Sequence, residues 1–321
     1  IFCDDLPTLN LLASGVDPAI KKKIDMQPWD VSHNNARHPV QTPDVVIEAF
    51  GCELPERYLA GLFIASIKPI IINLEYLSAE PWITEFHGKA SPQSHGIPKY
   101  FFFPGFQEEV GGLLLDPIPA EGRLTDNDIP SDLKNVWSNL RPGAKRISVF
   151  CYPGAPLKKW LENLGSLGEE VDILLAHGHA EQLNLYGEQP ISLPRNLQLI
   201  SMPFVSQDEY DWVLSQCDFN IVRGEDSFVR AQLAGKPFIW HIYPQEDRAH
   251  EVKLAAFLDL YLEEASQELR LATIAAMTWA MPREWFGKLE VWNTHAKGWR
   301  THLLEKQADG GLPARLIRFV A

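Results

Sequence analysis

The stretch FNIVRGEDSFVRAQLAGKPFIWHI, Phe219 to Ile242, decides the fold class of the second half of this chain. Its first segment, Phe219 to Val222, is continuously apolar, as is typical of a strand buried on both faces of a parallel sheet. A charged turn follows, and then the helical pattern of Ser227 to Leu233 and a second apolar strand, Phe238 to Ile242. A strand, a helix and a strand in this order predict a parallel α/β unit.

The same alternation extends outward from this stretch to Arg146. Further short apolar strands are expected at Ile147 to Phe150, Val171 to Leu175 and Leu197 to Ser201, and helices at Ala155 to Leu164 and Asp208 to Gln216. The tail from Leu254 to Ala321 is predicted to be mainly helical. In the first half, strands are expected at Val45 to Ile47 and Ile70 to Ile72, with a helix at Pro55 to Ile67 between them.

The length and these patterns predict two Rossmann-like, doubly wound α/β domains. We expect an N-terminal domain of residues 1–143 and a C-terminal domain of residues 144–321 that includes the helical tail. Arg141 to Gly143, an Arg-Pro-Gly sequence, is the expected hinge. Ligands of doubly wound folds bind at the carboxyl ends of the strands, so the loops that follow the strands are the places to search for a site.

Composition excludes several classes of function. The net charge of -13 argues against a nucleic-acid-binding protein with a broad basic face. Four scattered cysteines form neither a disulfide framework nor a zinc motif, which makes a reducing cytoplasm the expected location. We expect no membrane span, because no apolar run approaches about 18 residues. The start, Ile1 to Asp5, does not resemble a signal peptide.

The beginning of the chain is too short for the fold expected of it. Ile1 to Cys3 has the pattern of the end of an opening strand, whereas Asp4 and Asp5 have the pattern of a loop that follows a later strand. A parallel crossover needs about a dozen residues or more, and none stand between them. Either this is not a crossover, or residues are absent between Cys3 and Asp4. A similar compression occurs at Trp29 to Asp44.

The turn Arg-Gly-Glu-Asp-Ser, Arg223 to Ser227, stands where a ligand is expected. The unpaired amides and the dipole of the following helix favour an anion, Gly224 lets the backbone approach a phosphate, and Arg223 adds a charged donor. Glu225 or Asp226 could bind sugar hydroxyls or orient Arg223. The alternative is a capped helix with a local ion pair, and the pattern by itself leaves both open.

Aromatic residues follow two other strands of the same domain. Phe150 and Tyr152 come after the first strand, where a base could stack, although buried core aromatics would show the same pattern. Tyr243 comes after the last strand, in what could equally be a turn built on Pro244. The two histidines of Ala176 to Ala180 (AHGHA) lack further ligands at a matching spacing, so no metal site is expected.

Two α/β domains with nucleotide-binding features only in the second describe a GT-B glycosyltransferase, with the domains facing a cleft. A nucleotide-sugar epimerase would show the same arrangement. The sequence lacks a P-loop, a Gly-x-Gly-x-x-Gly motif and a Ser-His-Asp arrangement, which disfavours kinases, dehydrogenases and hydrolases.

Several long blocks resemble one family of bacterial enzymes. These blocks are DVVIEAFGCELP (residues 44–55), NLEYLSAEPW (73–82), YFFFPGF (100–106) with GGLL (111–114), and RGEDSFVRAQLAGKPFIWHIYPQED (223–247). They are similar to the EarP family, the protein-arginine rhamnosyltransferases that modify elongation factor P. The resemblance implies an inverting, metal-independent GT-B enzyme. It would move L-rhamnose from dTDP-β-L-rhamnose to an arginine side chain of elongation factor P, without a cofactor.

The resemblance also implies roles for individual residues. Arg223, Glu225, Asp226 and Ser227 would hold the diphosphate and sugar of the donor, with Glu225 as the catalytic candidate that positions the donor and the loop. Gln207 and Tyr243 would lie nearby, and Phe150 and Tyr152 would flank the thymine.

One departure from the family stands at the start of the chain. The family carries a loop close to Asn-Tyr-Gly-Asp after its first strand, whose aspartate is the expected general base, whereas Cys3 is followed directly by Asp4 and Asp5. These two aspartates match a later family segment and are not assigned the catalytic role. A chain without the loop would bind dTDP-rhamnose and not transfer it, so a catalytically inactive binding protein stays open beside the transferase and the epimerase.

Overall fold

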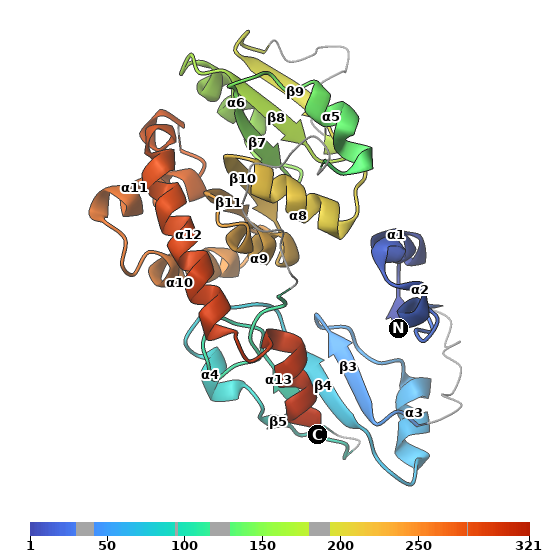
Figure 1. Cartoon of the computed structure of the whole chain (residues 1–321). Coiled ribbons are helices and arrows are strands. Elements are labelled where there is room, and N and C mark those ends of the chain that lie inside the picture. The colour runs from blue at the N-terminus through green and yellow to red at the C-terminus, as the bar shows by residue number, and fades with distance from the viewer. Residues whose placement is uncertain (30–41, 94–95, 116–128, 180–192, 281) are drawn as a thin grey trace. The chain divides into compact units, whose positions relative to one another are not determined.

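The computed structural model describes residues 1–321 except 30–41, 94–95, 116–128, 180–192 and 281. The chain forms two compact units, Ile1–Leu115 with Lys306–Ala321, and Asp116–Glu305. Figure 1 shows the ribbon of each unit.

The second unit is built on a five-stranded parallel sheet in the order β11-β10-β7-β8-β9. Two strands, β8 and β9, extend the sheet on one side of β7, and β10 and β11 extend it on the other. The strands are β7 (Lys145–Val149), β8 (Val171–Leu175), β9 (Leu197–Ser201), β10 (Phe219–Arg223) and β11 (Phe238–His241). This is the doubly wound domain predicted from the alternation of strands and helices.

Helices connect these strands and continue into the tail, which is mainly helical as predicted. They are η3 (Ser131–Leu133), α5 (Lys134–Ser138), α6 (Leu157–Gly165), α8 (Gln207–Gln216), α9 (Asp226–Leu233), α10 (Ala249–Tyr261), α11 (Gln267–Met277), η4 (Pro282–Glu284), η5 (Phe286–Lys288) and α12 (Leu289–Lys306).

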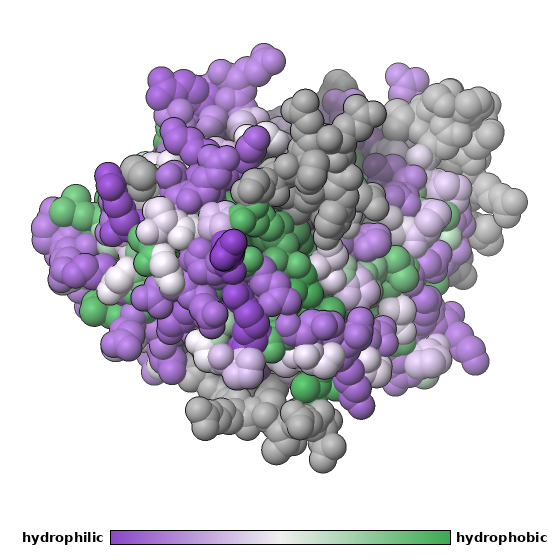
Figure 2. All heavy atoms as spheres, turned by 90° about the horizontal axis from the view of Figure 1, so that it is seen from above, coloured by the Kyte–Doolittle hydropathy of each residue, from purple (hydrophilic) through white to green (hydrophobic). Residues whose placement is uncertain are grey.

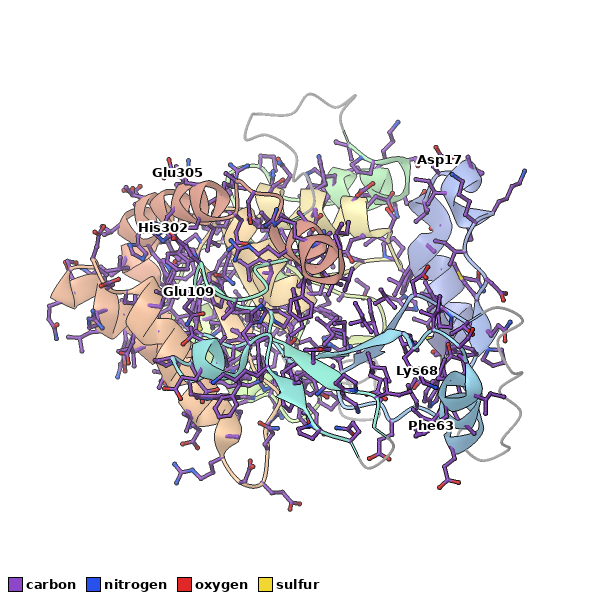
Figure 3. The ribbon with its side chains drawn as sticks, turned by 90° about the horizontal axis from the view of Figure 1, so that it is seen from below. Asp17, Phe63, Lys68, Glu109, His302 and Glu305 are labelled. Atoms are coloured by element: carbon purple, nitrogen blue, oxygen red, sulfur yellow. The ribbon has the colours of Figure 1, made fainter. Side chains whose placement is uncertain are left out.

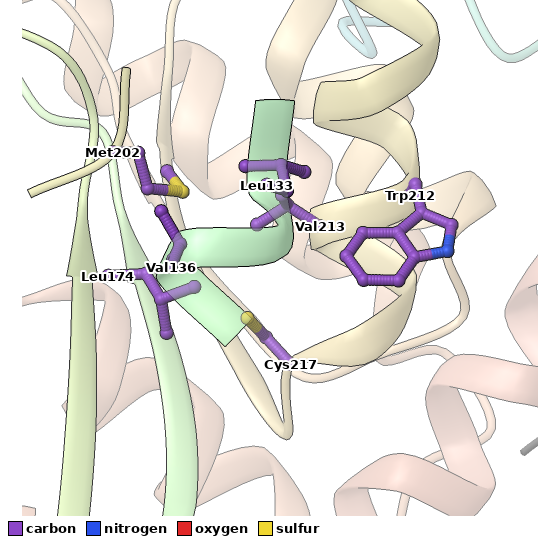
Figure 4. Close-up of a cluster of buried hydrophobic side chains, with 7 residues drawn as sticks. All are labelled: Leu133, Val136, Leu174, Met202, Trp212, Val213 and Cys217. Carbon is purple, nitrogen blue, oxygen red and sulfur yellow. The ribbon is translucent and has the colours of Figure 1, made fainter. Parts of the chain in front are cut away.

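Apolar layers cover both faces of this sheet. On one face, side chains from η3, α5 and α8 pack on β8 and on residues that follow β9, in the cluster drawn in Figure 4: Leu133, Val136, Leu174, Met202, Trp212, Val213 and Cys217. On the other face, Phe219 of β10 stacks on Trp285 with ring centroids 4.6 Å apart. Trp160 of α6 stacks on the same tryptophan. These layers fix the strands, and therefore the positions of the loops at their ends.

The first unit contains a four-stranded sheet in the order β3-β4-β6-β5, in which only β5 runs antiparallel. Val46, Leu62, Ile71 and Ile97 form a buried cluster against it. Its elements are β1 (Phe2–Cys3), α1 (Leu6–Leu12), η1 (Ala13–Gly15), α2 (Pro18–Lys21), β2 (Gln27–Pro28), β3 (Val45–Ala49), α3 (Glu56–Ile64), β4 (Ile70–Leu74), α4 (Ile83–Phe86), β5 (Ala90–Ser91), β6 (Lys99–Phe102) and α13 (Gly311–Val320).

The division of the chain differs from the predicted boundary between residues 143 and 144. Leu133 and Val136, which precede that boundary, are buried in the core of the second unit. The expected hinge is also wrong, because the Arg141 guanidinium bonds the buried Asp172 of β8 at 2.7 Å and so fixes this segment to the second unit. The last helix, α13, belongs to the first unit instead: Phe319 packs on Phe102 at 5.6 Å between ring centroids.

The opening of the chain also differs from the expectation. Asp5 does not begin a loop after a later strand; its carboxylate accepts from the Thr8 amide at 3.0 Å and caps α1 directly after β1. The segment with η1 and α2 then leads to β2, which pairs in parallel with β1. Residues 4–26 therefore supply one crossover. The second compressed stretch, Trp29 to Asp44, lies mostly outside the described residues.

One face of the protein is largely polar. Figure 2 shows one face, on which hydrophilic residues predominate and apolar residues form small groups. A typical exposed pair is Lys68 and Phe63, labelled in Figure 3, with the ammonium 5.5 Å from the ring centroid. Within the described ranges, none of the helices has both the length and the apolar character needed to cross a bilayer.

Candidate donor site

The candidate site lies at the carboxyl edge of the sheet of the second unit, between β7 and β10. These strands are neighbours and parallel, with Ile221 beside Val149, yet β10 comes three strands after β7 in the chain. The sheet order therefore reverses between them, and the crevice at such a switch point is where open α/β sheets bind ligands. The two loops that start there carry Phe150 and Tyr152 on one side and Gly224 to Asp226 on the other.

The Arg223 guanidinium lies over the two predicted aromatics. Its Cζ is 4.2 Å from the centroid of the Phe150 ring and 5.0 Å from that of Tyr152. Cation–π contacts of this kind hold the planar group in one orientation. No ion pair with Arg223 occurs among the residues that the structure describes, so its positive charge is not neutralised by a carboxylate there. A fixed guanidinium at a switch point is well suited to a diphosphate.

Local hydrogen bonds fix the backbone that carries this arginine. The Ser227 hydroxyl donates to the Arg223 carbonyl oxygen, and the Arg223 amide donates to the same hydroxyl at 3.2 Å. Gly224 has a φ of 65°, in the left-handed region that favours glycine. Its carbonyl oxygen accepts from the Trp240 indole at 2.7 Å. Ser227 is buried, and the role that the structure shows for its hydroxyl is to close the turn onto Arg223.

The two acidic residues of the turn have basic partners. A Glu225 carboxylate oxygen lies 3.9 Å from Lys253 Nζ of α10. The Asp226 carboxylate accepts from Arg230 Nε at 2.9 Å, and Arg230 in turn bonds the buried Asp211 of α8 at 2.6 Å. The local ion pair considered from the sequence is therefore present. A side-chain cap is absent from this described segment, because Glu225 stands at the N-cap position of α9 and makes no capping hydrogen bond.

The remaining predicted residues lie around the two aromatics. Tyr243 is 62% exposed and meets the Tyr152 ring edge-on, with centroids 5.2 Å apart. Gln207 is the first residue of α8, and Tyr210 of the same helix contacts Phe150 at 5.9 Å. The structure thus brings Arg223, Phe150, Tyr152 and Tyr243 into one group, whereas Gln207 is placed near it only through its helix.

Comparisons with known proteins identify the family of this chain. A family model described as "Elongation-Factor P (EF-P) rhamnosyltransferase EarP" matches residues 1–321. The chain belongs to the EarP family. A protein-arginine rhamnosyltransferase of Pseudomonas putida is 36% identical over 348 residues, which cover 99% of this chain and 89% of the relative. One from Pseudomonas aeruginosa is 38% identical over 305 residues, covering 88% of this chain and 80% of the relative.

A solved structure of the family shares the fold, which confirms the GT-B fold class expected from the sequence. It is described as "Structural basis for EarP-mediated arginine glycosylation of translation elongation factor EF-P", with a TM-score of 0.55 and 31% identity. The match covers 68% of this chain and 75% of that chain. This EarP family member is therefore a glycosyltransferase. The alignment with the P. putida relative runs over 348 positions, more than the 321 residues of this chain. At some aligned positions the relative therefore has a residue and this chain has none.

Two histidines of this family member contact the site: sequence reasoning missed His241 and considered His179 only as a metal ligand. His241, the last residue of β11, accepts a hydrogen bond from the Tyr152 amide at Nδ1, at 3.0 Å. His179 is buried, and its Nε2 lies 2.9 Å from the amide nitrogen of Cys151. Burial lowers the pKa of both imidazoles, and the charge of Arg223 lowers each pKa further. A histidine at the carboxyl end of the last strand was the available signal for His241.

Of the AHGHA histidines, His179 therefore contacts Phe150, with 5.5 Å between the ring centroids. Groups of three or more His, Cys, Asp and Glu that could hold a metal ion do not occur among the described residues.

Burial also raises the pKa of the Cys151 thiol to about 11, against the opposing effect of Arg223, so this thiol is neutral at physiological pH.

Proposed function

We propose that this EarP family member transfers L-rhamnose from dTDP-β-L-rhamnose to an arginine side chain of elongation factor P, in the cytoplasm. The observation that carries the proposal is the Arg223 guanidinium fixed over Phe150 and Tyr152 at the switch point of a doubly wound sheet. This arrangement offers a positive charge and aromatic surfaces to one ligand, as a nucleoside diphosphate requires. The family membership supplies the sugar and the acceptor.

In the proposed complex, the donor diphosphate lies against Arg223 and the first amides of α9. The positive end of the α9 dipole and the guanidinium both favour the two phosphates. Phe150 and Tyr152 contact the thymine, with Tyr243 beside Tyr152. Asp226 and Gln207 are donor contacts in the proposal, and Ser227 keeps the turn closed on Arg223.

Transfer then proceeds in one displacement with inversion at C1 of the rhamnose. A guanidinium nitrogen of the acceptor attacks C1 from the face opposite the diphosphate, and the bond from C1 to the diphosphate oxygen breaks. The nucleotide dTDP leaves with the electron pair, and the positive groups named above stabilise its charge. Because an arginine guanidinium has a pKa above about 12 and is a poor nucleophile, a carboxylate must orient it and take its proton as the new bond forms.

Glu225 positions the donor and the turn in this proposal. Its carboxylate follows Arg223 by two residues and is held near Lys253, at 3.9 Å. The proton from the acceptor goes to a different carboxylate, which the family resemblance expects in a loop after the first strand. Since Asp5 caps α1, it is already engaged by Thr8 and is not assigned this task.

A second candidate function is a protein that binds the donor without transferring the sugar. The observation in its favour is the aligned length of the P. putida relative, which exceeds this chain and so shows residues that the chain lacks. If the general base is among them, the donor site described here would be kept and transfer would be lost.

One experiment separates the candidates. The protein is incubated with dTDP-β-L-rhamnose and elongation factor P, the acceptor is analysed by intact mass spectrometry and fragmentation, and dTDP binding is measured by calorimetry. A gain of one deoxyhexose on an arginine supports the transferase. An unmodified acceptor together with clear dTDP binding supports the binding protein. Conversion of the nucleotide sugar in the absence of acceptor would support an epimerase.

A further inference from the structure

His241 is connected to the aromatic part of the site by a directional hydrogen bond. It is the last residue of β11 and lies beside Arg223 of β10 in the parallel register. Its Nδ1 accepts from the amide of Tyr152, which belongs to the loop after β7, one strand further away. Since Nδ1 acts as the acceptor, the neutral imidazole carries its proton on Nε2.

This hydrogen bond holds the backbone that carries the Tyr152 ring. Two successive amides of the loop after β7 contact histidine rings. The Cys151 amide contacts Nε2 of His179, and the Tyr152 amide contacts Nδ1 of His241. The His241 ring also packs against Tyr152, with centroids 5.7 Å apart. The Tyr152 ring then lies 5.0 Å from the Arg223 guanidinium. Losing the acceptor at His241 would free the Tyr152 backbone and loosen this stack.

We propose that His241 is a positioning residue of the donor site: its unprotonated Nδ1 holds Tyr152 against Arg223, and protonation of that nitrogen weakens nucleotide binding. The proposal rests on the proposed function, because it assumes that the nucleotide of the donor binds beside Tyr152.

The surroundings of His241 give the direction of the pH dependence. The groups that face it are Tyr152 from the loop after β7, Arg223 from β10, and the uncharged Trp279, whose ring centroid is 5.4 Å away. Burial lowers the His241 pKa, and the Arg223 charge lowers it further. The bonding form is the neutral one, so the hydrogen bond is complete at neutral pH. It is lost as the pH falls through a value below the ordinary histidine pKa of about 6.5.

Two substitutions of His241 distinguish the hydrogen bond from simple packing. In His241→Asn the amide oxygen can occupy the place of Nδ1, whereas in His241→Gln it lies one methylene further out, near the place of Nε2. We expect His241→Asn to bind dTDP nearly as well as the wild type. We expect His241→Gln and His241→Ala to bind it about 3- to 10-fold more weakly, as for the loss of one hydrogen bond.

A matched control exists in the first unit. His87 Nδ1 accepts from the Phe103 amide at 3.1 Å, so it makes the same kind of bond as His241. His87→Ala removes that bond in the other unit and is expected to leave the affinity for dTDP unchanged.

The test is calorimetry of dTDP with each variant at about pH 7.5 and at the lowest pH at which the protein stays folded, because the His241 pKa lies below the ordinary histidine value of about 6.5. We expect the wild type to lose more affinity at the lower pH than His241→Asn does, since protonation of the nucleotide itself affects both equally. Imidazole nitrogen NMR of the wild type gives a readout without any substitution, and it should show the proton on Nε2 of His241.

The outcomes that overturn the inference differ from those that overturn the proposed function. Equal dTDP affinities and equal pH profiles for the wild type and all His241 variants would overturn the inference alone. The same holds if His241→Asn binds dTDP as weakly as His241→Ala, or if NMR shows the imidazole proton on Nδ1. A folded wild type that does not bind dTDP would overturn the proposed function and the inference with it.

Discussion

The buried ion pair between Arg230 and Asp211 supports the start of α9 and gives the sharpest stability prediction. The side chains are 7% and 1% exposed, and Nη1 lies 2.6 Å from Oδ2. Arg230→Met keeps much of the side-chain volume but leaves the Asp211 carboxylate in the core without its guanidinium. Breaking a buried pair from one side costs about 3–5 kcal/mol.

The expected effect can be measured as a melting temperature and by chemical denaturation. For about 150–250 residues, 1 kcal/mol corresponds to about 2–4 °C, so Arg230→Met should melt about 6–20 °C below the wild type. Asp211→Asn should be milder, since Arg230 keeps Asp226, whose carboxylate lies 2.9 Å from Nε. The double variant Asp211→Leu with Arg230→Met should recover much of the lost stability, because both charges of this buried pair are then removed.

The matched control is the pair Arg248 and Glu251, whose side chains are 74% and 50% exposed. Arg248→Met should leave the melting temperature nearly unchanged, as is usual for a surface pair. The reasoning would be refuted if Arg230→Met were no more destabilising than Arg248→Met, or if the double variant were as unstable as Arg230→Met.

Three further predictions concern the turn at Arg223. Arg223→Ala should weaken dTDP binding by about 10- to 150-fold, the equivalent of one charge-assisted hydrogen bond of about 1.5–3 kcal/mol. The affinity of Arg223→Lys should fall between those of Arg223→Ala and the wild type. Equal binding by all three proteins would contradict the assignment of Arg223 to the donor site. Gly224→Ala should lower the free energy of unfolding by about 1–2 kcal/mol in urea titrations, because alanine is strained at a φ of 65°. The new Cβ would lie 3.5 Å from the Tyr152 hydroxyl, an ordinary contact distance, so the loss comes from backbone strain and not from a clash. Glu225→Gln should slow rhamnosyl transfer in a single-turnover assay, and transfer at the wild-type rate would show that the carboxylate does not position the donor.

The order of elements in the second unit could be predicted from sequence because its strands are continuous apolar runs. Their carboxyl ends then identified the turn at Arg223 and the loop at Phe150 as candidates. The sequence could not show that β10 lies beside β7, since strand order depends on long-range pairing and not on local pattern. The contact of Arg223 with both aromatics follows from that order.

Other features depend on side-chain directions that a linear pattern does not contain. His241 reaches Tyr152 from β11, and the sequence separation of 89 residues gives no hint of it. The boundary predicted at residue 143 was wrong because it was placed at an Arg-Pro-Gly sequence, whereas the buried Asp172 ties Arg141 to the second unit. The position of α13 depends likewise on tertiary contacts, such as the Leu113 amide donating to Gln307 Oε1 at 3.1 Å.

The most direct test of the account is the mass of elongation factor P after incubation with dTDP-β-L-rhamnose and either the wild type or Arg223→Ala. The account predicts one deoxyhexose on a single arginine with the wild type, and a much slower gain with Arg223→Ala. Transfer by Arg223→Ala at the wild-type rate would contradict the assignment of the donor site. An acceptor left unmodified by a wild type that binds dTDP would contradict the transferase activity itself.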